Sequence, residues 1–162
     1  MQKQFPVTPA VRWLRERKAA FEPLLYGYEE HGGTAVSARE LGVDEHSVIK
    51  TLVMEDDRKE PLLVLMHGDR EVSTQALARQ SGRRWIAPCA PETAQKHTGY
   101  LVGGTSPFGT RKPLPVFAEA AIRTLPRLYI NGGKRGFLVA LAGETLWGLL
   151  QPTAVEAAAP KL

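Results

Sequence analysis

The sequence is poor in the residues that build disulfides and metal clusters. Its 162 residues include one cysteine, Cys89, which can form neither a disulfide within the chain nor a cysteine-based zinc cluster. The four histidines show no ligand spacing such as HxxxH, so we expect no metal site. Because no signature of a cysteine nucleophile surrounds Cys89, we interpret it as an inert structural thiol.

Long apolar runs and the common catalytic signatures are also absent. No stretch reaches the roughly 18 to 20 apolar residues of a membrane-spanning helix, and residues 1–7 lack the apolar segment of a secretory signal. We therefore expect a cytoplasmic protein that does not bind a membrane. The lack of a Walker loop, of HExxH and of GxSxG argues against the commonest nucleotide hydrolases, zinc proteases and serine hydrolases.

The composition fits one mildly basic globular domain. Hydrophobic residues make up 43% and charged residues 23% of the chain, which is an ordinary balance for a globular protein. We expect residues 1–162 to form a single domain, with a core over about residues 8–150 and a tail over residues 151–162. The 21 Lys and Arg against 17 Asp and Glu give a net charge of +4, which permits an anionic partner such as RNA without establishing one.

Helix and strand signals alternate along the chain and predict a mixed α/β domain. Helices are predicted at residues 9–22, 35–41, 46–48, 74–80, 91–98 and 143–150. Strands are predicted at residues 24–29, 49–54, 61–67, 85–87, 116–118, 127–130 and 137–141. Residues 99–115 hold four glycines and three prolines, too many for a regular element. An ordered loop of this length is usually functional.

Lys50 stands out because it interrupts an apolar stretch, VIKTL at residues 48–52. It lies at the predicted junction between a short helix and a strand, from which a lysine can project into a cleft at the end of a sheet. The commoner reason for such a pattern is an outward-facing lysine on a half-exposed strand.

Two glycine pairs, Gly103–Gly104 and Gly132–Gly133, leave the backbone bare. Successive N–H groups in such turns can bind a phosphate or a developing oxyanion, although turns that merely need a positive φ are commoner. Neither pair fits the dinucleotide fingerprint, so no nicotinamide cofactor is expected. The basic pairs at residues 111–112 and 134–135 could contact a nucleic-acid backbone, but such pairs are more often solvated surface.

In their order and spacing, VIKTL, TGYLVGGTSPFG and YINGGKRG resemble the YbaK/EbsC family, free-standing relatives of the editing domain inserted in bacterial prolyl-tRNA synthetases. The resemblance extends over residues 8–150. It implies an α+β fold with a curved mixed sheet of about six or seven strands surrounded by helices. It also implies a deacylase that hydrolyses mischarged tRNA in trans, best known for Cys-tRNA(Pro). The expected partners are the acceptor end of that tRNA and prolyl-tRNA synthetase, with no cofactor.

The resemblance also implies the site residues. Lys50 matches the lysine on which the family relies, and Gly103 matches a glycine of the substrate pocket, so both are catalytic candidates. The candidate substrate-binding residues are Tyr28, Gly104, Thr105, Asn131, Gly132 and Gly133. Our hypothesis is that Lys50 contacts the terminal phosphate or ribose, while backbone N–H groups around Gly103 and Gly132 face the ester carbonyl. Water or a group of the substrate would attack, so no protein nucleophile is needed.

This sequence departs from the family pattern at the predicted pocket. Leu138 stands where the cysteine-selective members carry Asp, and Asn131 stands where relatives often have Ser. The segment between Tyr28 and Leu41 is also shorter. These departures keep two alternatives open: the same reaction on Ser-, Thr- or Ala-charged tRNA, and a non-catalytic RNA- or nucleotide-binding module of the same fold.

Overall fold

Two β-sheets organise the computed structural model, which describes residues 4–161. Along the larger sheet the strands are β1 (Glu22–Leu25), β8 (Phe137–Leu141), β7 (Leu128–Lys134), β2 (Val48–Asp56), β3 (Pro61–His67), β6 (Val116–Glu119) and β9 (Thr153–Val155). An eighth strand, β5 (Ile86–Pro88), pairs with β2 beside this path. The smaller sheet pairs β10 (Ala158–Pro160) with β4 (Arg70–Val72).

The larger sheet is mixed. Strand β2 pairs with β7, β3 with β6, and β6 with β9 in parallel, whereas the other neighbours are antiparallel. The predicted mixed α/β fold is therefore confirmed, with eight strands in the main sheet in place of six or seven.

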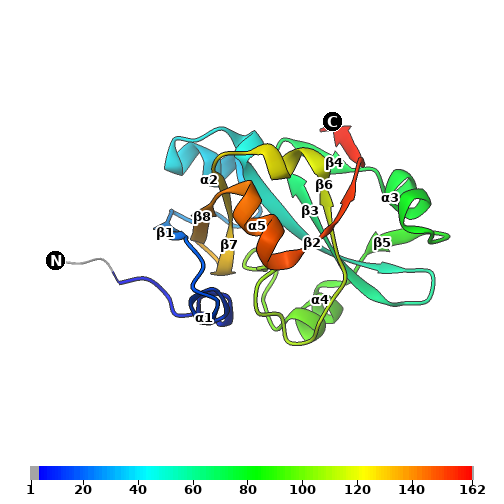
Figure 1. The fold of residues 1–162 in the computed structure, drawn as a ribbon, viewed down its shortest axis with the longest axis horizontal. Helices are drawn as coiled ribbons and strands as arrows, with labels where there is room; N and C mark the ends of the chain where they lie inside the picture. The colour runs from blue at the N-terminus through cyan, green and yellow to red at the C-terminus, as the bar shows by residue number, and fades with distance from the viewer. Residues whose placement is uncertain (1–3, 162) are drawn as a thin grey trace.

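Five α-helices and two 3₁₀ turns of the described residues surround the sheet (Figure 1). They are α1 (Pro9–Glu16), α2 (Gly33–Leu41), η1 (Glu45–Ser47), α3 (Thr74–Ser81), α4 (Pro91–Thr98), η2 (Ala120–Thr124) and α5 (Gly143–Leu150). Local chemistry sets several ends: the Thr8 and Ser73 hydroxyls accept N–H bonds from the first turns of α1 and α3. Over residues 4–161, none of the helices combines the length and apolarity needed to cross a membrane.

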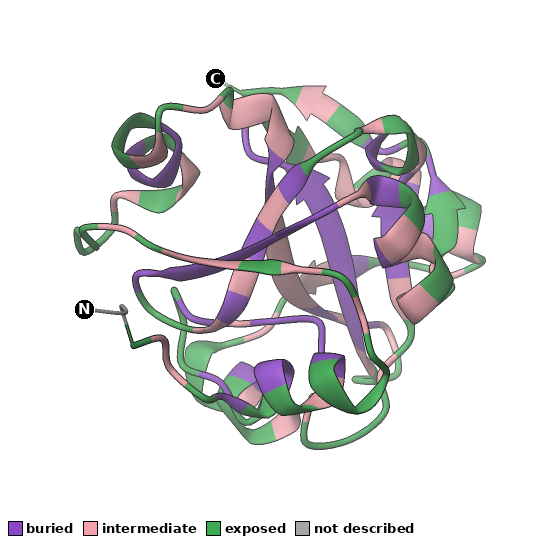
Figure 2. Cartoon of the chain, turned by 60° about the vertical axis from the view of Figure 1, so that its left-hand side comes forward, coloured by how far each residue is buried: buried purple, intermediate pink, exposed green. Residues whose placement is uncertain are grey.

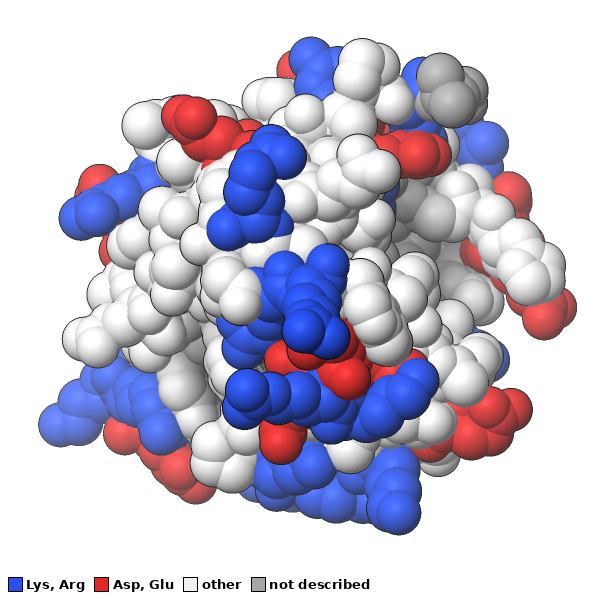
Figure 3. Space-filling view, turned by 90° about the vertical axis from the view of Figure 1, so that its right-hand side faces the viewer, with Lys and Arg blue, Asp and Glu red and all other residues white. Residues whose placement is uncertain are grey.

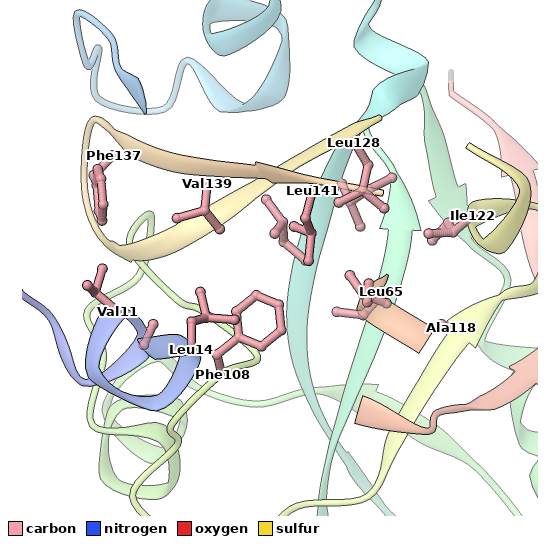
Figure 4. Packing of buried hydrophobic residues seen from close by; sticks show 14 of the residues in the cluster. Val11, Leu14, Leu65, Phe108, Ala118, Ile122, Leu128, Phe137, Val139 and Leu141 are labelled. Atoms are coloured by element: carbon pink, nitrogen blue, oxygen red, sulfur yellow. The ribbon is translucent and has the colours of Figure 1, made fainter. Parts of the chain in front are cut away.

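The main core lies between the sheet and helices α1 and α5, and the buried residues follow the central strands (Figure 2). In Figure 4, Val11 and Leu14 of α1 and Phe108 face Phe137 and Val139 of β8. Phe108 is fully buried, although it belongs to the loop of residues 99–115, which contains no helix or strand. This long loop is therefore anchored in the core.

Several segments differ from the sequence-based expectations. Strand β1 spans Glu22–Leu25 in place of residues 24–29, and β4 was not expected. Strand β7 continues through the second glycine pair to Lys134, with an irregular register between Asn131 and Lys134, so only Arg135 and Gly136 form the turn to β8. Helix α1 ends at Glu16, not near residue 22, because Arg17 and Lys18 leave the helical conformation. Residues 153–160, expected as a tail, supply β9 and β10, which pair with β6 and β4.

A substitution at Leu138 tests the packing beside Asn131. It pairs with Asn131 across the β7–β8 ladder, is 4% exposed, and packs against Ala38 and Val48. Leu138→Asp should lower the free energy of unfolding by about 3 kcal/mol, because it buries a carboxylate among apolar side chains. Leu138→Met, the matched control, should cost less than about 1.5 kcal/mol in the same urea titration. Equal stability of the Asp variant and the parent would contradict this packing.

Candidate functional site

The long loop (residues 99–115) is held in place at both ends. The Tyr100 hydroxyl donates to the Phe108 carbonyl at 2.6 Å, and the Arg111 N–H donates to the Thr98 carbonyl at 2.9 Å. Burial raises the pKa of the Tyr100 hydroxyl, which keeps it protonated as this donor. These bonds fix the part of the loop that contains Gly103 and Gly104.

The loop packs directly on the end of β7 and the turn that follows it. Asn131 Nδ2 donates to the Gly103 carbonyl at 3.1 Å, and Arg135 Nε donates to the Val102 carbonyl at 2.8 Å. A Cβ atom added to Gly104 would lie 2.8 Å from the backbone nitrogen of Arg135. Because only a glycine permits this approach, the structure brings the two glycine-rich segments together through bare backbone.

Asn131 also organises the irregular end of β7. Its Oδ1 accepts N–H bonds from Gly133 at 2.6 Å and Lys134 at 3.1 Å. Gly132 and Gly133 have packing reasons to be glycine, since added Cβ atoms would lie 2.5 Å from the Phe137 ring and 2.8 Å from the Tyr100 ring. These two positions therefore need glycine chiefly because a side chain would clash with the neighbouring rings.

These contacts determine which backbone donors remain for a ligand. The Gly104 N–H already bonds the Leu101 carbonyl at 2.9 Å, and those of Gly133 and Lys134 bond Asn131. The Thr105 hydroxyl donates to the Leu101 carbonyl at 3.3 Å, so it too is used within the loop. Among residues 4–161, none accepts a hydrogen bond from the Gly103 N–H. The Gly103 N–H is thus one of the loop donors that remain for a substrate oxygen.

Tyr28 and Arg135 lie at the same place as the glycine loop. We call the region formed by Tyr28, Gly103, Gly104, Asn131 and Arg135 the glycine corner. A Cβ atom on Gly103, whose φ is +87°, would lie 2.7 Å from the Tyr28 hydroxyl oxygen, and the Arg135 guanidinium lies 5.7 Å from the centre of the Tyr28 ring. Leu101 and Val102 are about half exposed beside them, at 52% and 51%. Sequence reasoning treated Arg135 only as one of a basic pair; its position directly after a glycine-rich strand end was the available signal.

Lys50 lies on β2, one residue beyond the parallel ladder that joins β2 to β7. The ladder pairs Val48 with Tyr129 and Ile49 with Ile130 and ends there, and Lys50 and Asn131 are the residues that follow on the two strands. Side chains alternate between the faces of a strand, so Lys50 and Asn131 project from the same face of the sheet. The sheet register therefore places the backbone of Lys50 next to the strand that carries Asn131.

The Lys50 amine itself contacts the other side of this region. Its Nζ donates to the carbonyl oxygen of Arg70 in β4, and within residues 4–161 no hydrogen bond joins it to either glycine segment. Burial lowers the pKa of the Lys50 amine below its ordinary value, and Lys161 lowers it further, while three nearby carboxylates act in the opposite direction. Lys50 is thus a half-buried amine held by a backbone carbonyl, not a lysine extended into solvent.

Other reactive groups are less suited to chemistry. Within residues 4–161, no group of three His, Cys, Asp or Glu side chains is arranged to hold a metal ion. Burial raises the pKa of the half-buried Cys89 thiol, which disfavours the reactive thiolate.

Comparison with known proteins identifies the class to which this fold and site belong. The family model of the aminoacyl-tRNA editing domain matches residues 29–148, so the chain belongs to that family, as the resemblance of its motifs predicted. EbsC of Enterococcus faecalis, provisionally named a Cys-tRNA(Pro)/Cys-tRNA(Cys) deacylase, is 27% identical over 143 residues, which cover 88% of this chain and 87% of EbsC. A proline–tRNA ligase of Brachyspira hyodysenteriae is 30% identical over 86 residues, 53% of this chain but only 15% of the ligase.

Solved structures show the same fold. A hypothetical protein superposes with a TM-score of 0.85 at 19% identity, covering 93% of this chain and 99% of the other. A candidate trans-editing enzyme for prolyl-tRNA synthetase superposes with a TM-score of 0.80 at 20% identity, covering 95% and 99%.

Proposed function

We propose that this protein is a deacylase that acts in trans, hydrolysing the ester between a wrongly attached amino acid and the terminal adenosine of tRNA, with Cys-tRNA(Pro) as its first substrate. Membership of the editing-domain family supports the reaction class, and the name of EbsC supports the choice of cysteine. The structural observation that carries the proposal is the contact of the Gly103 loop with Asn131 and Arg135, where Asn131 follows the ladder that joins β7 to the strand of Lys50.

The chemistry asks for positioning and charge stabilisation more than for a nucleophile. Attack on the ester carbonyl puts negative charge on its oxygen, and the bond to the ribose oxygen then breaks. A backbone N–H aimed at the developing oxyanion stabilises this charge without reorganisation. We assign this role to the Gly103 N–H, because the described residues give it no acceptor and the Gly103 carbonyl is held by Asn131.

Two cations are suited to orient the end of the tRNA. An ammonium group has three N–H donors, so Lys50 can keep its bond to the Arg70 carbonyl and direct the others to a ribose or phosphate oxygen. Arg135 uses Nε on the Val102 carbonyl, which leaves its two terminal nitrogens for a phosphate. The exposed ring of Tyr28 and the neighbouring Leu101 and Val102 provide an apolar surface for the terminal adenine.

The amino acid selected is a separate part of the proposal. The buried Leu138 gives an apolar side chain where the cysteine-selective members of the resembled family carry Asp. Ser-, Thr- and Ala-charged tRNA therefore stay as alternative substrates of the same site. Prolyl-tRNA synthetase is a candidate partner for choosing the tRNA, and the cytoplasm is the expected location.

A deacylation assay on tRNA charged with Cys, Ala, Ser or Thr tests the proposal. We expect at least one of these esters, Cys-tRNA(Pro) first, to be hydrolysed well above the rate without protein, and correctly charged Pro-tRNA(Pro) to stay intact as the control. If all four mischarged tRNAs survive, the deacylase proposal is wrong. Binding of tRNA without hydrolysis would then identify the non-catalytic module of the same fold.

A further inference from the structure

A second basic region lies at the far end of β2 from Lys50. A groove of about 710 Å³ is lined there by the β2–β3 turn, the segment after α3, and the end of the long loop. We call it the hairpin groove, and its lining residues are Asp56, Asp57, Arg58, Glu60, Pro61, Ser81, Gly82, Arg83, Arg84, Lys112, Pro113, Leu114 and Pro115. Figure 3 views this end of the molecule and shows Lys and Arg side chains over its centre, with Asp and Glu side chains between them.

The carboxylates of the groove are largely satisfied within the protein. Asp56 is 4% exposed, forms an ion pair with Arg83 at 2.9 Å, and accepts N–H bonds from Arg58 and Glu60. Asp57 accepts the backbone N–H of Arg84 at 3.1 Å. The lining therefore holds four cationic side chains against three carboxylates, of which Asp56 is neutralised by its ion pair with Arg83.

Apart from Arg83, the cations of the groove have no such ion pair among the described residues. The exposed side chains of Arg58, Arg84 and Lys112 form no ion pair with any residue between 4 and 161. A smaller hollow of about 360 Å³ shares the wall at Arg84 and adds Arg79 and the exposed Trp85. Opposed cationic walls with an aromatic ring at the edge suit the sugar–phosphate backbone of a nucleic acid.

The long loop connects this groove to the glycine corner. It contacts Asn131 and Arg135 through residues 102–104 and lines the hairpin groove through residues 112–115. Between these ends the exposed Arg111 lies against Gly99. From Lys50 to Asp56, β2 advances by about 20 Å at roughly 3.3 Å per residue. One RNA molecule can therefore reach both places, its flexible end at Gly103 and a helical part at the groove.

The geometry points to the hairpin groove as the docking surface for the helical stem of the same tRNA whose 3′ end enters the glycine corner. This inference rests on the proposed function. A-form RNA helices are recognised mainly through their shape, phosphates and 2′-hydroxyls, so the groove adds affinity for tRNA without reading its sequence. Discrimination between amino acids then belongs to the glycine corner alone.

Charge reversal on the two walls of the groove tests the inference through binding of uncharged tRNA. Arg84→Glu/Lys112→Glu should weaken this binding at least tenfold and reduce the slope of log K against log salt by about 1 to 2. The matched control is Arg15→Glu/Lys18→Glu, which makes the same change in net charge on exposed residues at the end of α1 and should alter affinity less than twofold. Circular dichroism of both variants verifies that they are folded.

A second measurement separates this inference from the proposed function. Hydrolysis of a short aminoacyl ester of adenosine, which has no helical stem, should be unchanged in the groove variant. If the parent hydrolyses no ester, the proposed function fails, but the tRNA-binding comparison still decides the role of the groove. The docking surface is refuted if the parent does not bind tRNA, or if the groove variant binds it as tightly as the control does.

Discussion

Replacement of Lys50 by alanine is expected to reduce the kcat/KM for the mischarged tRNA by about 100-fold or more. The substitution removes the half-buried amine together with its bond to the Arg70 carbonyl. Loss of a single preorganised group that orients or stabilises an ester transition state commonly costs about 10²–10³ in rate. Single-turnover deacylation under excess protein measures the effect on the chemical step.

The matched control for this variant is Arg70→Ala. It removes the exposed side chain but retains the backbone carbonyl that accepts the Lys50 bond, so activity should stay within about twofold of the parent. A Lys50→Ala variant that is folded and nearly as active as the parent would remove Lys50 from the mechanism. The glycine corner would then have to act through Gly103 and Arg135 alone.

Replacement of Gly104 by alanine should have an effect of similar size for a different reason. Gly104 does not have a positive φ, so an alanine there causes no backbone strain of its own. Its Cβ would instead lie 2.8 Å from the Arg135 nitrogen and 3.0 Å from the Lys134 carbonyl carbon, which forces the loop and the β7 end apart. A displacement near 1 Å at a reacting group can cost about 100-fold in rate, and we expect a loss of that order in kcat.

Gly148→Ala controls for the chemical change itself. A Cβ atom at Gly148 meets nothing within 4 Å, so this variant of α5 should keep full activity and gain up to about 1 kcal/mol of stability from better helix propensity. Thermal unfolding and deacylation are measured together for both variants. Full activity in Gly104→Ala would show that the close approach of the two segments is not needed for catalysis.

Much of the fold can be predicted from the sequence where local patterns are strong. The apolar run at residues 61–67 gives β3 with its observed bounds, and the glycines and prolines of residues 99–115 give the long loop. Strands β9 and β10 could not be predicted in this way. Their short segments, rich in alanine, threonine and proline, become strands only because β6 and β4 pair with them. The continuation of β7 through two glycines likewise depends on its neighbour β8.

The candidate site could be predicted only in part, because several of its contacts join segments that are distant in the sequence. The family resemblance predicts Lys50, Gly103 and Asn131 as site residues, and the structure brings Gly103 and Asn131 into contact. The hydrogen-bond acceptor of Lys50 is a backbone carbonyl, which every residue carries, so the sequence does not indicate it. The contact of Arg135 with Val102 spans distant segments, so only the folded chain shows why this arginine differs from its neighbour Lys134.

The burial of Phe108 and Tyr100 bears on how fast a substrate is captured. Because these side chains hold the long loop in the core, its conformational entropy is already lost in the free protein. In the proposed deacylase, the end of a tRNA therefore meets a loop whose anchoring residues are already ordered. The cost of ordering then falls mainly on the flexible RNA terminus.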